Sequence, residues 1–384
     1  MIPSESRDAL VAGGGPAGSL LAIALAAAGR DVLVIEKTRE AHHKVCGEFL
    51  SPECVPFLRR AGIDLEELGA QSVHSVRLAA RDVLAEVRLP ETALSLTRRT
   101  LDEALLQRAK HSGAGVVRGY QVESLSLSNT GTWRAQIASG DSPESIYVEG
   151  RDAFLATGKH DLRGWPRSAK RVQGSLVAMK MYFQLSPRQQ TELAGHVEIF
   201  LYPGGYGGLQ PVEGGCANLC VLITREKLRS LGGKWDRLLD HIQSHSAHLT
   251  RRLSGAIPAL ERPLAMSSIP YGYCAAICTD RPSPWRLGDQ AAVIPSFCGD
   301  GMAIALHSAY RAAQLYLDGK TSANFQAEIQ QRFEHTLRFS TLLSRMVIAA
   351  PSIAQAVKLW PAALAGIFSA TRVPSGCECG VRSC

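Results

Sequence analysis

The chain has 384 residues, of which 46% are hydrophobic and 20% charged, and it carries a formal net charge of +7. These values exclude a disordered chain and leave room for two lobes with substantial cores. The positive charge is too diffuse to indicate a nucleic-acid-binding protein, but it suits an anionic small molecule or loose attraction to an anionic membrane surface.

The N-terminus and the cysteines bear on the cellular compartment. Residues 1–8 are mostly polar and lead directly into an apolar segment, which argues against a signal peptide, and no apolar run is long enough to span a membrane. Cysteines with three intervening residues have poor zinc spacing, and most of the others stand in apolar contexts typical of reduced thiols. We therefore expect a cytoplasmic protein without a metal site; the spaced pairs are Cys216 with Cys220 and Cys274 with Cys278.

The first predicted unit runs from Asp8 to Glu36. A short apolar strand breaks into a G-x-G-x-x-G turn, an Ala/Leu-rich helix follows, and a second apolar strand ends at Glu36. The glycines permit a tight turn, close approach of the backbone to a pyrophosphate and close helix packing, and the helix N-terminus favours phosphate. The sequence therefore predicts a dinucleotide site whose ribose is bound by the acidic residue. The predicted contacts are Gly13, Gly15, Pro16, Ala17, Gly18, Glu36 and Lys37.

The following segments are interpreted from turn residues and hydrophobic periodicity. The patterns predict, in order, a loop at 42–52, a helix at 53–62, strands within 73–89, a helix at 98–110, an antiparallel meander at 116–148 and an apolar strand at 152–158 that ends in Ala-Thr-Gly.

The middle of the chain predicts a second sheet followed by a helix. We expect strands at 171–184 and within 197–223, the latter interrupted by a glycine-rich turn at 202–211, and a helix at 235–253. Three histidines follow helical spacing, and two of them could share a metal, but neither an H-E-x-x-H pattern nor a nearby acid supports this. We therefore predict a solvated helix face for His241, His245 and His248.

The C-terminal part contains a second glycine motif. Gly288-Asp289 is followed by a proline and then by a Gly-x-Gly that opens a long apolar helix. Residues 324–338 predict a charged amphipathic helix. Residues 342–368, broken by two prolines, predict short helices that cap the substrate side or lie on a membrane. We expect a disordered tail at 374–384, where the role of Cys377, Cys379 and Cys384 stays open.

Three of these elements together resemble flavoproteins of the p-hydroxybenzoate hydroxylase and geranylgeranyl reductase group. They are the N-terminal glycine turn, the R-x-x-L-D-x-x-L that begins at Arg98, and the Gly-Asp, Pro, Gly-x-Gly series. The resemblance implies FAD as the cofactor, with Asp289 on the ribityl chain, Arg98 on the cofactor and Pro295 beside the isoalloxazine ring. The remaining implied cofactor contacts are Cys46, Gly47, Gly288, Gly299, Gly301 and Met302.

Two further segments resemble the reductases of this group. Lys44–Glu48 is similar to a Cys-Gly segment that approaches the flavin, so Cys46 either tunes the flavin or donates a proton, or it is a small residue that permits close approach. Tyr206–Pro211 is similar to a Gly-Tyr-x-Trp-x-x-Pro segment that lines the pocket, with Gly208 in place of the tryptophan. Cys46 and Tyr206 are therefore the candidate catalytic residues. Thr157 replaces an acid usual in the group, which bears on the subfamily and not on the fold.

The predicted fold is α/β, or α+β overall. It combines a Rossmann-like FAD-binding lobe built on a parallel sheet, an antiparallel-sheet substrate lobe and C-terminal helices. The predicted boundaries are 1–72, 98–168 and 272–322 for the FAD-binding lobe, 73–97 and 169–271 for the substrate lobe, 323–373 for the C-terminal helices and 374–384 for the tail.

The predicted function is that of an FAD-dependent oxidoreductase. We expect a monooxygenase that uses NAD(P)H as a transient reductant and hydroxylates a hydrophobic aromatic or isoprenoid molecule through a flavin C4a-hydroperoxide. The alternatives are reduction of a C=C bond, as in geranylgeranyl reductases, and a non-catalytic flavin-binding or electron-transfer protein. Halogenation is less favoured, because the sequence contains no Trp-x-Trp-x-Ile-Pro segment. The sequence leaves open the substrate, the choice between NADH and NADPH, the oligomeric state and peripheral membrane contact through the C-terminal helices.

Overall fold

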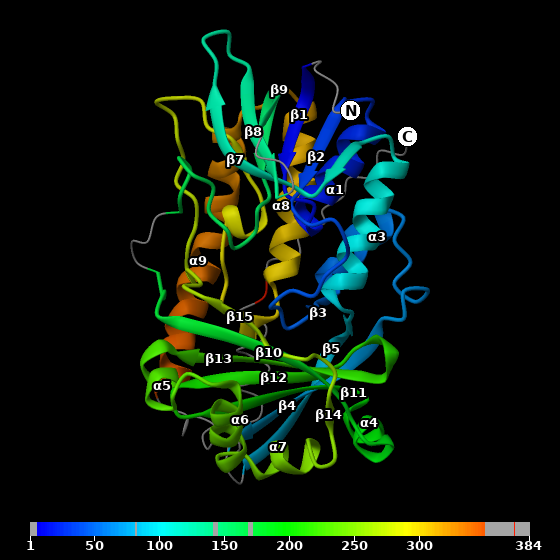
Figure 1. Ribbon diagram of the computed structural model, residues 1–384, viewed down its shortest axis with the longest axis vertical. Coiled ribbons are helices and arrows are strands. Elements are labelled where there is room, and N and C mark those ends of the chain that lie inside the picture. Colours follow the sequence, from blue (N-terminus) through cyan, green and yellow to red (C-terminus); the bar gives the residue numbers. More distant parts are fainter. Residues whose placement is uncertain (1–5, 81–82, 141–144, 168–171, 350–371, 373–384) are drawn as a thin grey trace.

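The computed structural model describes residues 6–80, 83–140, 145–167, 172–349 and 372. Two sheets organise this part of the chain, one above the other in the view of Figure 1, with the long helix α9 (Ser322–Ala349) running beside both. None of the described helices combines the length and the mean hydropathy that a membrane span requires.

The first sheet has a parallel centre, as expected from apolar strands that alternate with helices. Its strands are β1 (Arg7–Ala12), β2 (Val32–Glu36), β6 (Gly115–Arg118), β7 (Tyr120–Leu127), β8 (Trp133–Ser139), β9 (Ile146–Leu155) and β16 (Trp285–Arg286). The order is β6-β2-β1-β9-β8-β7, with β16 paired to β9. The strands that meet through β1 come from distant parts of the chain, since β9 pairs with β1 in parallel register.

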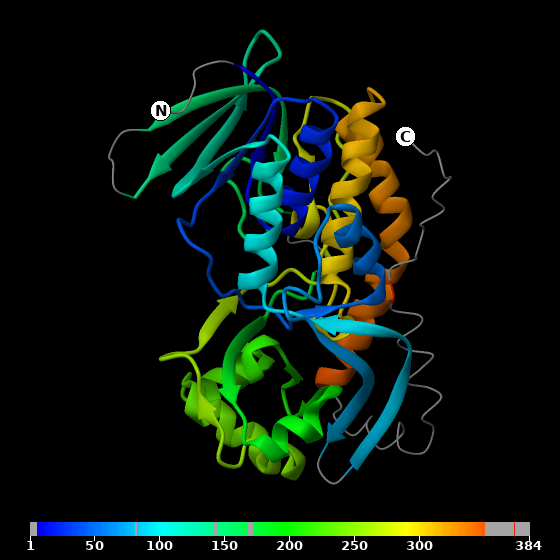
Figure 2. The same ribbon diagram turned by 90° about the vertical axis from the view of Figure 1, so that its right-hand side faces the viewer.

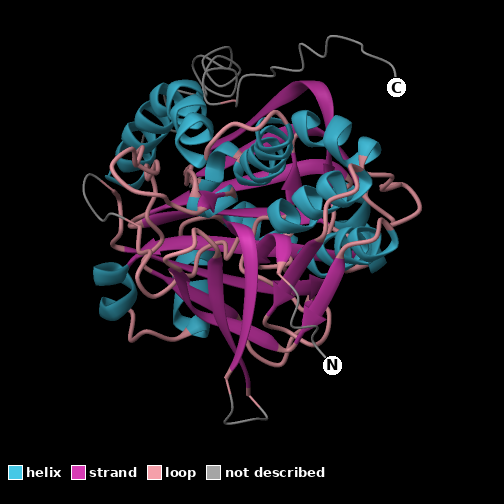
Figure 3. Ribbon diagram, turned by 90° about the horizontal axis from the view of Figure 1, so that it is seen from above, coloured by secondary structure: helices cyan, strands magenta, loops and turns pink. Residues whose placement is uncertain are grey.

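Helices cover one face of the first sheet. Helices α1 (Pro16–Ala27), α3 (Arg98–His111) and α8 (Gly301–Leu317) pack together around one apolar core, in which Leu21 and Leu105 are fully buried (Figure 2). Seen from above, most helices lie along one side of the strands (Figure 3). A short turn η1 (Pro52–Cys54) and helix α2 (Val55–Arg60) join this core beside α8.

The second sheet is mostly antiparallel, in the order β14-β10-β13-β12-β11-β4-β5-β3, with β15 paired to β10. Only the β4–β11 pair among its strand pairs in the described residues is parallel. Its strands are β3 (Phe49–Leu50), β4 (Gln71–Ala80), β5 (Val83–Ser95), β10 (Leu176–Gln184), β11 (Gly195–Tyr202), β12 (Gly205–Pro211), β13 (Cys216–Thr224), β14 (Ile257–Pro258) and β15 (Leu264–Ser267).

The second sheet has two differently covered faces. Its outer face packs against α4 (Pro187–Leu193), α5 (Arg225–Ser230), α6 (Trp235–Ser244) and α7 (Ala247–Arg252) (Figure 1). Its inner face carries Ala178, Leu222 and Tyr206, which pack with Ile269 and Val293 in a separate core. This inner face turns toward the first sheet. The short turns η2 (Glu213–Gly215), η3 (Gly288–Gln290) and η4 (Ser296–Cys298) complete the elements.

The predicted glycine-rich turn at 202–211 is wrong in its extent. The reversal occupies only residues 203–204, and β12 begins at Gly205 and pairs with both β11 and β13. A Cβ on Gly205 would lie 1.9 Å from the Leu222 carbonyl oxygen, so the glycine permits close contact between strands. Glycine here marks close backbone approach inside a sheet and not a loop.

The predicted helix at 235–253 is two helices, α6 and α7, separated at His245 and Ser246. The Ser246 side chain caps α7 by accepting a hydrogen bond from Leu249 N. Serine is a favoured N-cap residue, so its presence here favours the start of a new helix. The histidines are not a solvated face: His248 Nε2 lies 3.0 Å from buried Glu198 Oε1, and His241 bonds the Pro203 carbonyl.

The predicted end of the amphipathic helix at residue 338 is also wrong, because α9 continues without interruption to Ala349. Buried Ser340, Thr341 and Ser344 keep the helix packed beyond its charged part, and no proline precedes Pro351 in this helix. The rest of the predicted C-terminal helices and the tail lie outside the described residues, apart from Arg372. The lobe boundaries remain a prediction.

Candidate functional site

A cavity of about 810 Å³ lies where the carboxyl ends of β1 and β2 face the inner side of the second sheet. This position follows the general rule for open α/β sheets, in which ligands bind beyond the carboxyl ends of the strands. Fourteen of the predicted contacts line it: Gly13, Gly15, Pro16, Ala17, Glu36, Lys37, Cys46, Gly47, Arg98, Gly288, Asp289, Gly299, Gly301 and Met302.

The glycine turn after β1 is shaped by close packing on one side and open space on the other. Gly13 has a φ of +106°, and a Cβ there would lie 2.5 Å from the Ala156 carbonyl oxygen. A Cβ on Gly18 would lie 2.0 Å from the Gly13 oxygen, which places Gly18 behind the turn and not on the cavity. Gly15 instead faces space, since a Cβ on it would have only Arg98 Nη2 nearby, at 3.6 Å. The turn therefore leaves its backbone and the α1 N-terminus open to a phosphate group.

Glu36 ends β2 with its carboxylate held in place. Gly14 N donates to Oε2 at 2.8 Å, and Thr38 N and Oγ1 donate to Oε1 at 3.0 and 2.8 Å. Burial alone would raise the pKa of Glu36, but the charge of Lys44 and these hydrogen bonds outweigh it and lower the pKa. The residue is thus an ionised acceptor at the cavity wall, which suits a ribose hydroxyl.

Arg98 brings a guanidinium to the same wall from the start of α3. Its Nε and Nη2 donate to Asp102 Oδ1 and Oδ2 at 2.6 and 2.8 Å, and Lys44 Nζ lies 2.8 Å from Asp102 Oδ2. Burial would raise the pKa of Asp102, but Arg98 and Lys44 lower it. The aspartate of the predicted motif therefore orients the arginine, which also hydrogen-bonds Cys46.

The second glycine motif closes the cavity at the α8 N-terminus. Gly288 N donates to Ser308 Oγ at 2.9 Å, which holds the Gly-Asp turn against α8. Gly299 has a φ of +79°, and a Cβ there would lie 2.7 Å from Phe49, whereas Gly301 faces open space. The α8 N-terminus therefore points at the cavity beside the turn, as it would for the polar edge of a flavin.

A buried ion pair beside Cys46 is not among the sequence-based predictions. Glu48, which lies two residues after Cys46 and has a φ of +63°, pairs with Lys180 of β10 at 2.7 Å, and both side chains are fully buried. Tyr182 Oη and Arg98 N also donate to Glu48 Oε1, while Oε2 has no partner among the described residues. A signal for Lys180 is present in the sequence, since it is a single charge inside the apolar run of β10.

The Cys46–Gly47 segment is fixed from the second sheet. Asn218 Nδ2 of β13 donates to the carbonyl oxygens of Cys46 and Gly47 at 3.1 and 2.9 Å. Glu48 N donates to Cys46 Sγ at 3.3 Å, and Cys46 lines the cavity. His43 joins the cluster through Tyr182 Oη at 3.1 Å, and burial together with the charges of Lys180 and Arg99 lowers the pKa of His43 to about 4.

Two predicted residues lie behind the cavity wall. Tyr206 is buried with its hydroxyl 3.0 Å from Ser296 Oγ, and it does not line the cavity, although Ser296 does. Burial raises the pKa of Tyr206 above its ordinary range. Pro295 is also absent from the lining, whereas its neighbours Ile294 and Ser296 face the cavity. Direct contact of Tyr206 and Pro295 with a ligand remains a prediction, and the geometry favours an indirect role through Ser296.

These residues fit FAD. The cavity has a helix N-terminus at each of two glycine turns, an ionised acceptor at the end of β2, and space at Gly15, Gly47 and Gly301 that a larger side chain would occupy. The unpartnered buried oxygen of Glu48 lies on the same cavity. Within the described residues no group of three or more potential metal ligands was found.

Comparison with known proteins supports FAD as the cofactor. Residues 6–146 match the FAD binding domain family. A menaquinone reductase of Mycolicibacterium smegmatis is 26% identical over 355 residues, which cover 89% of this chain and 84% of the relative. Digeranylgeranylglycerophospholipid reductase 2 of Methanopyrus kandleri is 26% identical over 371 residues, which cover 88% and 87%. Among solved structures, the flavin-dependent brominase Bmp2 superposes with a TM-score of 0.79 at 17% identity, covering 97% of this chain and 94% of that one.

The fold, the cavity and these similarities define an FAD-dependent enzyme of the oxidoreductase type. The chain is similar in sequence to menaquinone reductases, digeranylgeranylglycerophospholipid reductases and flavin-dependent halogenases, and the predicted fold class and resemblance are confirmed.

Proposed function

We propose that this protein reduces a carbon–carbon double bond of a lipophilic isoprenoid compound, with FAD as its redox cofactor. The observation that carries the proposal is the composition of the cavity wall opposite the glycine turns. Ala178, Cys220 and Leu222 of the second sheet, with Leu264 and Ile269, form an apolar wall that faces Cys46. A hydrocarbon chain would gain free energy by leaving water for this surface.

The similarities to known proteins support this choice over the hydroxylation predicted from the sequence. The menaquinone reductases and digeranylgeranylglycerophospholipid reductases align over about four fifths of the chain or more, and their names describe reduction of isoprenoid-bearing molecules. The likeness to brominase and halogenase structures, at 15–20% identity, concerns the fold alone.

FAD, when bound, would supply the hydride-transfer chemistry, with NAD(P)H as the source of reducing equivalents. The residues of the chain would bind and orient. Glu36 and the two glycine turns would hold the adenosine and pyrophosphate, and Arg98 would fix the loop that carries Cys46 through their hydrogen bond. Reduction of an alkene also requires a proton, and we assign its delivery to the Cys46 thiol, which lies on the cavity between the two sheets.

Hydroxylation of a phenolic compound is the second candidate, and one observation favours it. A row of hydrogen bonds leads from His43, through Tyr182, to Glu48 beside the cavity. Such a row could accept the proton of a phenol that enters beside it, as hydroxylation of an aromatic ring would require.

One experiment distinguishes the candidates. FAD-loaded protein is reduced anaerobically with NADPH or NADH and then mixed with a menaquinone carrying an isoprenoid tail, and the product is analysed by mass spectrometry. The proposal predicts a product that is still heavier by two hydrogens after air has reoxidised any quinol to the quinone, so that the gain lies in the isoprenoid tail. This product should form without oxygen and should be lost in Cys46→Ala but retained in Cys216→Ala, a half-buried thiol that does not line the cavity. A product containing one added oxygen atom, formed only in air, would establish hydroxylation. Rapid NAD(P)H oxidation that leaves unchanged both the menaquinone and a phenolic compound supplied in a parallel reaction in air would contradict both candidates.

A further inference from the structure

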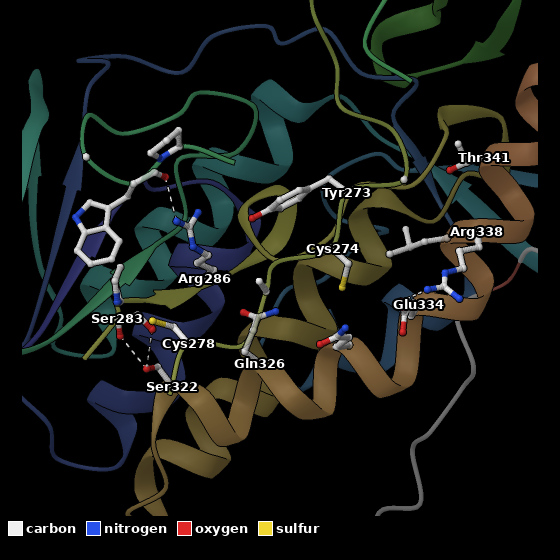
Figure 4. Close-up of a pocket in the computed structure, with 18 of the residues that line it drawn as sticks. Tyr273, Cys274, Cys278, Ser283, Arg286, Ser322, Gln326, Glu334, Arg338 and Thr341 are labelled. Carbon is white, nitrogen blue, oxygen red and sulfur yellow. Dashed lines mark hydrogen bonds and ion pairs between the residues drawn. The ribbon is translucent and has the colours of Figure 1, made fainter. Parts of the chain in front are cut away.

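A second cavity, of about 830 Å³, lies between α9 and the stretch 272–286 that leads into the Gly-Asp turn (Figure 4). It shares no lining residue with the flavin cavity, and consecutive residues of one stretch separate the two: Tyr271 faces the flavin cavity, whereas Gly272 and Tyr273 face the second one. Its volume is typical of a small-molecule site.

The lining of the second cavity is strongly basic. It contains four arginines, which are Arg281, Arg286, Arg338 and Arg345, against one carboxylate, Glu334. Glu334 is already paired with Arg338 at 2.6 Å. Cys274 adds no negative charge to this wall, because burial raises the pKa of its thiol to about 12. The lining arginines therefore exceed the carboxylates by three positive charges, in a cavity that is open to solvent on one side.

Arg286 is the most firmly placed of these arginines. It is partly buried, and its Nη2 donates to the Trp165 carbonyl oxygen at 3.1 Å while Nη1 donates to Gln290 Oε1 at 3.3 Å. Figure 4 shows its guanidinium at the cavity beside Tyr273. These two bonds use two of its five N–H donors, and a guanidinium anchored in this way is preorganised for a two-point contact with an oxyanion.

A buried donor aimed at the same space lacks a partner. Gln326, on the α9 stripe that continues through Gln330 and Glu334, is 5% exposed, and its Nε2 has no hydrogen-bond acceptor among the described residues. In Figure 4 its side chain projects from α9 towards the 272–286 stretch. Thr341, 6% exposed and on the same wall, has a hydroxyl that likewise lacks a partner in the described part of the chain. Unpartnered buried polar groups are rare in native proteins, and a ligand that accepts from the amide would satisfy it.

We propose that this second cavity is a binding site for a small polyanion, which bears phosphate or carboxylate groups and is bound by Arg286, Gln326 and the arginines of α9. Both kinds of group accept paired hydrogen bonds from guanidinium and a further one from an amide. The site is independent of the function proposed for the flavin cavity, because no residue of one lines the other.

The test is calorimetric titration of the FAD-loaded protein, in a phosphate-free buffer of low ionic strength, with pyrophosphate in one arm and citrate in the other. We expect one binding site for at least one probe, and the arm that binds identifies the chemistry. Arg286→Gln should weaken binding about tenfold, and Gln326→Met, which keeps the size and the net charge, should weaken it about threefold to tenfold. The matched charge control is Arg237→Gln, exposed on α6 in the second lobe, which should bind as the wild type does.

FAD content and the visible spectrum are measured for each variant, because Arg286 immediately precedes the Leu-Gly-Asp turn. If Arg286→Gln fails to retain FAD, Gln326→Met decides the question. Absence of heat with both probes would overturn the site, as would wild-type affinity in Gln326→Met. Equal weakening of binding in Arg237→Gln would show that only the overall charge of the protein matters. Release of FAD by pyrophosphate would show that the anion binds in the flavin cavity instead.

Discussion

At the scale of single residues, Glu36 is the clearest example of a side chain that is fixed in place at the cavity wall. Its carboxylate is oriented by Gly14 and Thr38 before any ligand arrives, and its lowered pKa keeps it ionised at neutral pH. An acceptor that is charged and already fixed loses little conformational entropy on binding a ribose hydroxyl.

We predict that Glu36→Arg purifies largely without FAD. The change removes the ribose acceptor, breaks the hydrogen bond from Gly14 and brings a second positive charge near Lys44. The check is the ratio of flavin absorbance, at about 450 nm, to protein absorbance after purification. The visible band belongs to the flavin and not to the polypeptide, so the ratio measures how much FAD is bound. Glu40→Arg, an exposed neighbour with the same charge change, is the control and should retain the wild-type ratio. Full FAD occupancy in Glu36→Arg would refute the ribose role.

Much of this residue-scale detail follows from sequence because the glycine turns are local. The conformations that Gly13 and Gly299 require, and the acid at the end of β2, belong to short motifs that the sequence displays. No such motif predicts the Glu48–Lys180 ion pair. The two residues lie 132 positions apart in the sequence, and no local pattern indicates that they are in contact. The positive φ of Glu48 is equally hidden, since glutamate gives no sign of it.

At the scale of elements, the close spacing of β12 and β13 depends on glycine at particular positions. Gly205→Ala would place a methyl group 1.9 Å from the Leu222 carbonyl oxygen, a backbone atom that cannot rotate away. We expect a loss of about 3 kcal/mol in the free energy of unfolding, as for an overpacked interior. Urea denaturation measures it. Gly208→Ala in the same strand meets nothing within 4 Å and should change stability by less than about 1 kcal/mol; equal losses in the two variants would contradict the packing argument.

The packing of α8 against α9 should make stability depend on pH. His307 of α8 is 4% exposed, between Phe57 and Phe333, and its burial and the charges of Arg332 and Arg311 lower its pKa to about 4. The unfolded chain binds a proton near pH 6.5. Because the folded state binds that proton only at lower pH, stability falls as the pH falls from about 6.5 to about 4, by up to about 3 kcal/mol.

The measurement compares the wild type with His307→Leu in urea at pH 7 and pH 4.5. His43 has a similarly lowered pKa and contributes equally in both proteins, so the difference between the two pH slopes isolates His307. The variant should lose less stability on acidification. Parallel slopes would show that His307 takes up its proton in the folded state as readily as in the unfolded one.

The existence of an element is easier to predict than its extent. Apolar periodicity predicts β1, α1, β2 and the helix after the second glycine motif, all of which contribute to buried cores. The errors share a cause, since the glycines of β12 resemble those of a loop and the polar residues of α9 after position 338 resemble a helix end. In both places tertiary contact overrides the local signal, through strand pairing for β12 and through burial of Ser340 and Ser344 for α9.

At the scale of the whole molecule, the Glu48–Lys180 pair ties the loop between β2 and β3 to β10 of the second sheet. Glu48 ends the loop that leaves β2, and Lys180 lies in the middle of β10, with neither side chain exposed. We predict that Lys180→Met alone lowers the free energy of unfolding by about 3–5 kcal/mol, because it leaves a carboxylate buried without its cation.

The double variant Lys180→Met, Glu48→Gln should recover much of that loss, since the uncompensated charge is gone while Tyr182 and Arg98 N still have an acceptor. A double-mutant cycle in urea gives the coupling energy. Additive single effects would mean that Glu48 and Lys180 are not coupled energetically, despite the short distance between them.

Strand β1 pairs with the distant strand β9, and both glycine turns line one cavity. This arrangement has a consequence while the ribosome makes the chain. The N-terminal turn leaves the ribosome early, but the α8 N-terminus that completes the cradle follows nearly three hundred residues later. In between, the entire second sheet must be made. The nascent chain therefore cannot bind FAD as its first folding step. The edges of its early strands stay unpaired until their distant partners have been synthesised. Cells short of flavin, or chains truncated before α8, should consequently yield a protein that depends on chaperones and is prone to proteolysis.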